Sequence, residues 1–203
     1  NLLPLMTFPA MLPVASQALA LSSAEAGWVG GIFFAGYTSA VFSISSLTDR
    51  FDPKRIYLAC CVLGIGASLG FAFWADGFWT SLVARFLGGV AVAGVHMPGL
   101  TLLRSVLGRE PNGSSTGFYA SCYALGNAVS FVVAGLIDAQ FGWSATFVAA
   151  AIGPFMAFCL VCFIPRPPRA DTFGVTKPKG APGLRQLFTD RPFMDYVIAF
   201  AGN

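Results

Sequence analysis

Two long apolar segments, residues 25–47 and 56–75, flank the charged turn Asp49-Arg50-Phe51-Asp52-Pro53-Lys54-Arg55. A helix needs about 20 apolar residues to cross the hydrocarbon core of a bilayer, and each segment is long enough. Short loops on the cytoplasmic side of a membrane collect Lys and Arg. The pattern therefore predicts two membrane-spanning helices joined by a tight cytoplasmic turn.

The composition points the same way. Of 203 residues, 56% are hydrophobic and 10% are charged, whereas a soluble domain carries about 25% charged residues. The basic residues fall near the expected helix ends and form no patch on a water-facing surface, which excludes nucleic acid as a partner. The chain shows no nucleotide-binding loop and no nucleophile–base pair, so we do not expect an enzyme.

The five cysteines all lie inside apolar segments, where a thiol packs as a small hydrophobic group. Cys159 and Cys162 form a C-x-x-C pattern, which is typical of some metal and redox sites. No second pair and no nearby histidine completes such a site. We therefore interpret these cysteines as packing residues and expect neither a metal nor a cofactor.

Apolar segments predict six helices at about 1–20, 25–47, 56–75, 79–105, 114–138 and 143–164, and a seventh that begins near Pro192. Ser22-x-x-Glu25 has the pattern of a capping box at the start of the second helix. Residues 165–191 hold five prolines, and proline cannot continue a helix. The predicted organisation is a six-helix transmembrane bundle at 1–164, a cytoplasmic linker at 165–191 and the start of helix 7 at 192–203.

The connections alternate between uncharged and basic, which predicts the topology. The basic ones, 49–55, 108–115 and 165–191, are expected on the cytoplasmic side together with the N-terminus. Trp28, Trp74, Trp79 and Trp143 all fall beside the uncharged ones, and indole rings favour the membrane interface. Because both ends of the chain lie next to or inside apolar runs, we expect a fragment of a longer protein; a natural half-size chain remains open.

Glycine spacing predicts where helices touch. Gly27-x-x-x-Gly31 and Gly66-x-x-x-Gly70 are patterns that allow close helix contact in membranes. Such faces could serve sliding helices or ordinary packing, and the sequence leaves both open.

Several motifs resemble those of the major facilitator superfamily. Leu47, Asp49, Arg50 and Lys54 match its loop signature G-x-L-a-D-R-x-G-R-[KR], although Ser45, Asp52 and Pro53 depart from it. Arg85-Phe86-Leu87-Gly88-Gly89 resembles R-x-x-x-G of helix 4, and Gly142-Trp143-Ser144-Ala145-Thr146-Phe147 resembles the G-W-R-x-x-F entry to helix 6. The resemblance implies an all-α, polytopic membrane helical bundle with 3+3 inverted repeats, the N-terminal half of a twelve-helix transporter.

The resemblance also implies a conformational latch at the cytoplasmic end. Asp49 would hold the two halves together in the outward-facing state, with Arg50, Lys54, Arg55 and Arg104 as its cationic surroundings. The alternative is a solvated charged turn.

Polar residues inside the membrane are candidates for a substrate or proton pathway. Arg85 either faces a cavity or a partner, or extends along the helix to the outer headgroups. His96 precedes Pro98 and titrates near neutral pH, but could equally be a packed core residue. Tyr119, Tyr123 and Asn127 follow one helical face, and Tyr37 and Gln17 could line the same cavity.

No carboxylate is expected in the middle of the membrane, so the buried charge available is positive. The leading hypothesis is a secondary active transporter that moves a small polar or anionic metabolite across a bacterial inner membrane by alternating access, with proton coupling. Its partners would be the lipid bilayer, the substrate and its own C-terminal half. The alternative is a transporter-like accessory or assembly subunit of a larger membrane complex.

Overall fold

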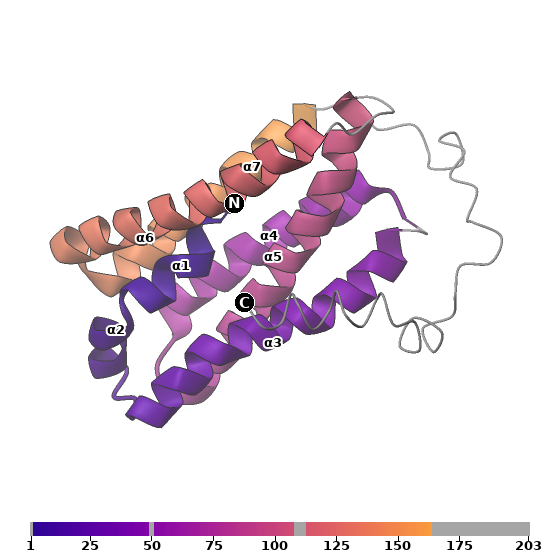
Figure 1. Ribbon diagram of the computed structural model, residues 1–203. Helices are drawn as coiled ribbons and strands as arrows, with labels where there is room; N and C mark the ends of the chain where they lie inside the picture. The colour runs from indigo at the N-terminus through magenta and orange to yellow at the C-terminus, as the bar shows by residue number, and fades with distance from the viewer. Residues whose placement is uncertain (1, 49–50, 108–112, 164–203) are drawn as a thin grey trace, which may run out of the picture. The chain divides into compact units, whose positions relative to one another are not determined.

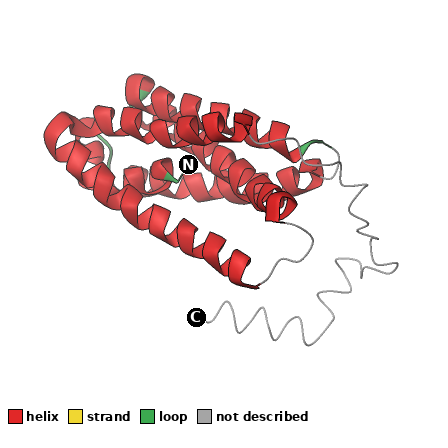
Figure 2. Ribbon diagram, turned by 90° about the horizontal axis from the view of Figure 1, so that it is seen from above, coloured by secondary structure: helices red, strands yellow, loops and turns green. Residues whose placement is uncertain are grey.

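The computed structural model describes residues 2–48, 51–107 and 113–163, and within these ranges the chain is helical with no strand (Figure 1). Figure 2 colours the described residues almost entirely as helix, with no strand. The all-α class is thereby confirmed. The predicted linker and the start of helix 7 lie outside the described residues, so the division into those parts stays a prediction. The helices are α1 Leu3–Ala10, α2 Leu12–Ala18, α3 Ser23–Thr48, α4 Pro53–Trp74, α5 Phe78–Leu107, α6 Gly113–Ala150 and α7 Ile152–Phe163.

The first predicted helix is two helices, which corrects the single span expected at 1–20. The break falls at Met11, between α1 and α2. Pro9 lies in the last turn of α1, and Pro13 occupies one of the first two positions of α2. A proline has no N–H and its ring clashes with the preceding turn, so two prolines four residues apart end one helix and begin another.

Gly142 replaces the predicted loop at 139–142 by a turn at a single residue. Its φ of 84° and ψ of 171° interrupt α6, and positive φ is readily adopted by glycine. After this turn Ser144 Oγ donates to the Ala72 carbonyl near the end of α4. Lys54 Nζ, near the start of α4, donates to the Cys162 carbonyl of α7. The chain after Gly142 therefore runs antiparallel to α4.

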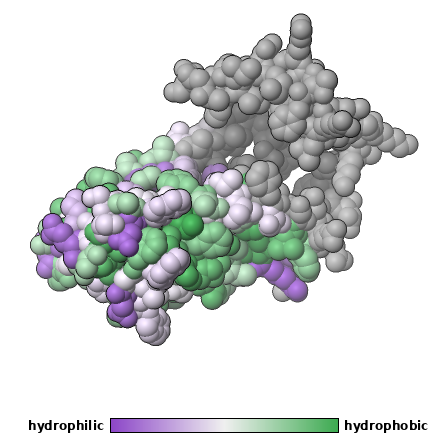
Figure 3. Space-filling view, turned by 90° about the horizontal axis from the view of Figure 1, so that it is seen from below, coloured by the Kyte–Doolittle hydropathy of each residue, from purple (hydrophilic) through white to green (hydrophobic). Residues whose placement is uncertain are grey.

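Three described stretches are long and apolar enough to cross a membrane: Pro53–Trp74, Phe78–His96 and Ser121–Phe163. A fourth candidate is the pair Leu12–Ala18 and Ser23–Val41, which is bent by 118°. The 43 residues of Ser121–Phe163 would extend about 65 Å as one helix, twice the thickness of a bilayer core. Because the chain turns at Gly142, this stretch crosses the membrane twice. Apolar side chains spread over the described surface in Figure 3, as lipid contact requires.

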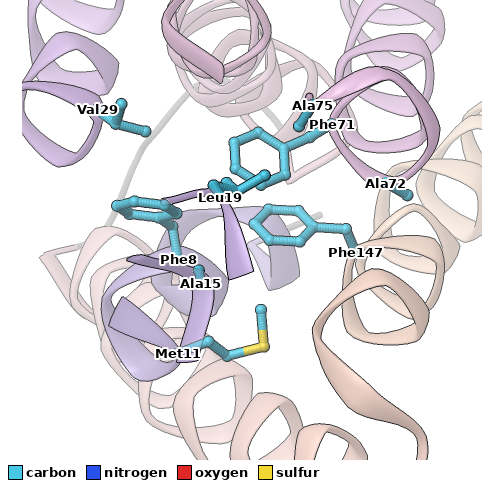
Figure 4. Close-up of a cluster of buried hydrophobic side chains, with 9 residues drawn as sticks. All are labelled: Phe8, Met11, Ala15, Leu19, Val29, Phe71, Ala72, Ala75 and Phe147. Atoms are coloured by element: carbon cyan, nitrogen blue, oxygen red, sulfur yellow. The ribbon is translucent and has the colours of Figure 1, made fainter. Parts of the chain in front are cut away.

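A cluster of buried apolar side chains joins five helices at one end of the bundle (Figure 4). The Phe71 and Phe147 rings stack with centroids 4.1 Å apart, and Phe8 meets Phe71 edge-on at 5.8 Å. Trp143 packs against the same cluster. We call this set the end cluster; it comprises Phe8, Met11, Ala15, Leu19, Val29, Phe71, Ala72, Ala75 and Phe147.

The end cluster explains where the tryptophans lie. Trp28 lies in the second turn of α3 beside Val29, Trp74 ends α4, and Trp79 is the second residue of α5, so all three share the end at which Trp143 packs. Lys54 and Arg55 lie at the start of α4, which is the opposite end. This separation agrees with the predicted aromatic belt. The remaining basic loops lie outside the described residues, and the assignment of the cytoplasmic side stays a prediction.

Close helix contact occurs at other glycines than those predicted. A Cβ on Gly27, Gly31, Gly66 or Gly70 would meet no atom within 4 Å, so the prediction that these four mediate close contact was wrong. The backbones of α3 and α5 approach each other at Gly36 and Gly89 instead. A Cβ at Gly36 would overlap the Phe86 carbonyl, and one at Gly89 would overlap the Phe33 carbonyl.

Replacing Gly89 tests this contact. We expect Gly89→Ala to lower the apparent Tm of the detergent-solubilised protein by about 3–6 °C, because overpacking against backbone costs about 1–3 kcal/mol. Gly31→Ala is the matched control, since nothing lies within 4 Å of its added Cβ and alanine favours a helix. Equal Tm values for both variants would contradict the close approach.

Candidate functional site

Arg85 is the one buried charged side chain in the described part of the chain, with 4% of its surface exposed. Its Nη1 donates to the Pro4 carbonyl of α1 at 3.2 Å. The guanidinium carbon lies 5.1 Å from the Phe8 ring centroid and 4.4 Å from the Phe33 ring centroid. The predicted alternative in which Arg85 extends to the headgroups was therefore wrong, because the side chain turns inward to α1 and α3.

The charge of Arg85 has no carboxylate partner among the described residues, and its Nε has no hydrogen-bond partner there. Burying a guanidinium costs several kcal/mol. One hydrogen bond from a charged donor returns about 1.5–3 kcal/mol, and each shielded cation–π contact about 2 kcal/mol. These terms are of the same size as the cost. The charge is thus stable in this position only while the carbonyl and both rings remain in place.

The first turn of α1 is held from two sides. Ser130 Oγ of α6 donates to the Leu3 carbonyl at 2.5 Å, and Arg85 of α5 donates to the next carbonyl, that of Pro4. The Leu2 side chain, next to this turn, packs against Gly126 of α6. A Cβ at Gly126 would overlap the Leu2 side chain, so the glycine leaves room for it. The backbone of α1 therefore serves as the common acceptor for α5 and α6.

Aromatic side chains from three helices gather next to this turn. Tyr37 of α3 and Tyr123 of α6 pack against the buried group formed by Leu5, Phe33 and Val92. The His96 ring of α5 meets the Tyr123 ring edge-on, with centroids 4.9 Å apart. We call Phe33, Tyr37, His96 and Tyr123 the aromatic cluster. Three of the predicted pathway residues are thus neighbours, and Phe33 links them to Arg85.

The polar face predicted for residues 119–130 lies toward the bundle where it is described. Ser130 is buried, Tyr123 and Asn127 are half-buried, and Leu125 and Val132 on the other face are 66% and 59% exposed. The Asn127 Oδ1 atom is buried without a hydrogen-bond partner in the described part of the chain. The Tyr119 side chain lies outside the described residues.

Gln17 is not among the residues that the structure gathers there. Its side chain is exposed on α2, whose buried residue Ala15 belongs to the end cluster. The break at Met11 separates α2 from the part of α1 that faces Arg85, so the expectation of a shared cavity with Tyr37 is not supported by the fold.

The predicted latch is described in part. Asp49, Arg50 and the Arg104 side chain lie outside the described residues. Arg55 is exposed, and Lys54 Nζ donates to the Cys162 carbonyl at 3.1 Å. A cation at the C-terminal end of a helix donates to a carbonyl of the last turn and matches the helix dipole.

Two residues have roles that were not predicted from the sequence. Asp52 is the N-cap of α4, and its side chain accepts from the Lys54 amide at 2.9 Å. The signal was present, since Asp followed by Pro53 is typical of a helix start. Phe33 as a partner of Arg85 had no local signal, because the two residues meet only through the packing of α3 on α5.

The described residues thus form a multi-pass helical membrane protein whose bundle buries a guanidinium and a group of aromatic rings. The sequence model of the Major Facilitator Superfamily matches residues 2–203, and the chain belongs to this superfamily.

Relatives match about three quarters of the chain. Synaptic vesicle glycoprotein 2C of Mus musculus is 27% identical over 157 residues, which cover 76% of this chain and 21% of the relative. A Bacillus subtilis protein named for niacin/nicotinamide transport, NiaP, is 26% identical over 160 residues, covering 77% and 39%. The niacin transporter NiaP of Acinetobacter baylyi is 27% identical over 147 residues, covering 72% and 33%. The chain therefore spans less than half the length of these relatives.

The anchoring of α1 can be tested at Ser130. We expect Ser130→Ala to cost about 1 kcal/mol, because the Leu3 carbonyl loses a donor from α6, and to lower the apparent Tm by about 2–4 °C. Ser121→Ala on the same helix is the control, since its exposed hydroxyl bonds to the carbonyl of Gly117 in its own helix. A Tm loss of equal size in both variants would argue against an anchor between α6 and α1.

Proposed function

We propose that the chain is the N-terminal six-helix half, with the start of helix 7, of a secondary active transporter for a small anionic metabolite. Transport would proceed by alternating access in a bacterial inner membrane. The observation that carries the proposal is Arg85, a buried cation that has no carboxylate partner in the described residues and contacts Phe33 of the aromatic cluster. Buried ionisable groups inside membrane bundles mark substrate and ion paths.

The substrate class follows from the side chains that face the interior. The described carboxylates Glu25, Asp52, Asp76 and Asp138 all lie in the first or last turns of helical legs or in the connections between them. Asp138 has a buried oxygen without a hydrogen-bond partner among the described residues, but it lies in the last turn before Gly142. The charge that contacts the aromatic cluster is the positive one of Arg85. Aromatic rings favour a flat ligand. Niacin, which names two of the relatives, is a pyridine carboxylate and has both properties.

The remaining candidate residues have proposed roles in the same path. His96 is the group suited to carry a proton near neutral pH, and its ring contact with Tyr123 supports a role for it in the same path. The unpartnered Asn127 Oδ1 supplies a hydrogen-bond acceptor. Tyr119 stays a proposed member of this path, whereas Gln17, which is exposed on α2, is not included in it.

Uptake by the full-length protein in proteoliposomes tests the function. We expect labelled niacin to accumulate in vesicles with protein and not in empty vesicles. If protons are coupled, an imposed pH gradient should change the initial rate by about fivefold or more, and a protonophore should remove that effect. Absence of uptake for niacin and a panel of other organic anions would contradict transport and favour the accessory-subunit alternative.

We further propose that Asp49 latches the two halves at the cytoplasmic end. Removing its charge in Asp49→Asn loses a hydrogen bond to a charged group, about 1.5–3 kcal/mol, which shifts a two-state equilibrium about tenfold or more toward the inward-facing state. Distances between spin labels on the cytoplasmic ends of the two halves measure the shift.

Asp52→Asn is the matched control for the latch. It removes a carboxylate from the same turn but keeps an N-cap side chain for α4, because asparagine caps helices as well as aspartate. An identical distance distribution in Asp49→Asn and the unmodified protein would leave Asp49 as a solvated turn residue.

A further inference from the structure

Phe33 takes part in two sets of contacts. Its ring lies over the Arg85 guanidinium, with 4.4 Å between ring centroid and central carbon. It also belongs to the buried group against which Tyr37 and Tyr123 pack. The Phe33 side chain is fully buried. Phe33 is therefore the member of the aromatic cluster that contacts the buried cation.

Arg85 retains bonding capacity in this arrangement. Phe8 and Phe33 cover the guanidinium and Pro4 takes one N–H, while the Nε hydrogen has no acceptor among the described residues. One turn earlier on α5, Ser81 Oγ is also fully buried without a partner in the described part of the chain. Two polar groups that are buried and incompletely bonded among the described residues therefore lie on the same face of α5.

We propose that Phe33 and Arg85 together set the preference for a carboxylate over its neutral amide. This inference rests on the proposed function, because it assumes that a flat ligand binds on the aromatic cluster. A ligand carboxylate at that position is drawn to the guanidinium and displaces the Phe33 ring. It then accepts from Arg85, including from the Nε–H that has no acceptor. Phe33 is a lid on the cation, and Arg85 is the group that recognises the anion.

Arg85 makes the site selective, and the lid reduces the preference because the carboxylate alone has to displace it. Moving the ring removes one of the contacts that keep the charge stable in the bundle, so the ligand has to replace that contact with a stronger one. A carboxylate does so by pairing with the guanidinium. A carboxamide of the same shape carries no charge, so it would compensate the guanidinium less well than the Phe33 ring does. It therefore binds with the Phe33 ring in place and does not reach Arg85. Two ligands of equal size are separated by charge alone.

Binding of pyridine-3-carboxylate and pyridine-3-carboxamide to the purified full-length protein tests the proposal. We expect the unmodified protein to bind the carboxylate at least about tenfold more tightly, as for a hydrogen bond between charged groups. Arg85→Gln should reduce this ratio to about twofold or less. Phe33→Leu should change it in the opposite direction, raising the ratio by about threefold, because the ring that competes for the guanidinium is gone.

Phe73→Leu is the matched control, because Phe73 lies on α4 and its ring is 64% exposed; its ratio should equal that of the unmodified protein. If Arg85→Gln does not fold, Arg85→Lys keeps the charge and should keep a preference for the carboxylate. Equal affinities for the two ligands in the unmodified protein, or a Phe33→Leu ratio that falls with that of Arg85→Gln, would overturn the lid while leaving transport intact. Binding of neither ligand would instead overturn the proposed substrate class, and the lid with it.

Discussion

The backbone contact between α3 and α5 determines how the interior of this bundle is arranged. Gly89 lies under the Phe33 carbonyl, and Arg85, one turn earlier on the same helix, lies over the Phe33 ring. Because both contacts involve the same residue, the distance between the two helices sets the distance between ring and cation. A larger side chain at position 89 would push α3 away and separate Phe33 from Arg85 and Tyr37 from Tyr123. The distance between α3 and α5 thus determines both the helix packing and the geometry of the candidate site.

Burying a cation in this position requires acceptors that do not come from carboxylates. The short helix α1 supplies one, since its Pro4 carbonyl receives the guanidinium while its Leu3 carbonyl receives Ser130. The phenyl rings of Phe8 on α1 and Phe33 on α3 supply the other favourable contacts to the cation. The charge therefore links three helices, and a rearrangement of any of them changes the environment of Arg85. Alternating access needs this property, because a movement of helices has to be felt by the group that binds the ligand.

Local features of the fold could be predicted from the sequence, and features that depend on pairing could not. The apolar segments predicted the helices from Ser23 to the turn at Gly142, whereas the helix predicted at 143–164 is divided at Ala151 between α6 and α7. The capping box was confirmed, with Glu25 Oε2 accepting from the Ser22 amide at 2.8 Å. The break at Met11 had a local signal in Pro9 and Pro13 that was outweighed by the hydrophobicity of the segment. Which glycines touch a neighbour depends on how helices face each other, and a spacing of four residues does not contain that information.

The bond between Lys54 and the end of α7 has a consequence for motion at that end of the bundle. Lys54 stands two residues after the N-cap of α4 and donates to a carbonyl in the last turn of α7, more than a hundred residues later in the chain. As long as this bond holds, the start of one helix and the end of the other shift together. A displacement of the charged turn before α4 is then transmitted to the point where the chain leaves α7. The start of α4 and the end of α7 therefore move together. A displacement at residues 49–55 reaches residue 163 through this hydrogen bond rather than through the buried core.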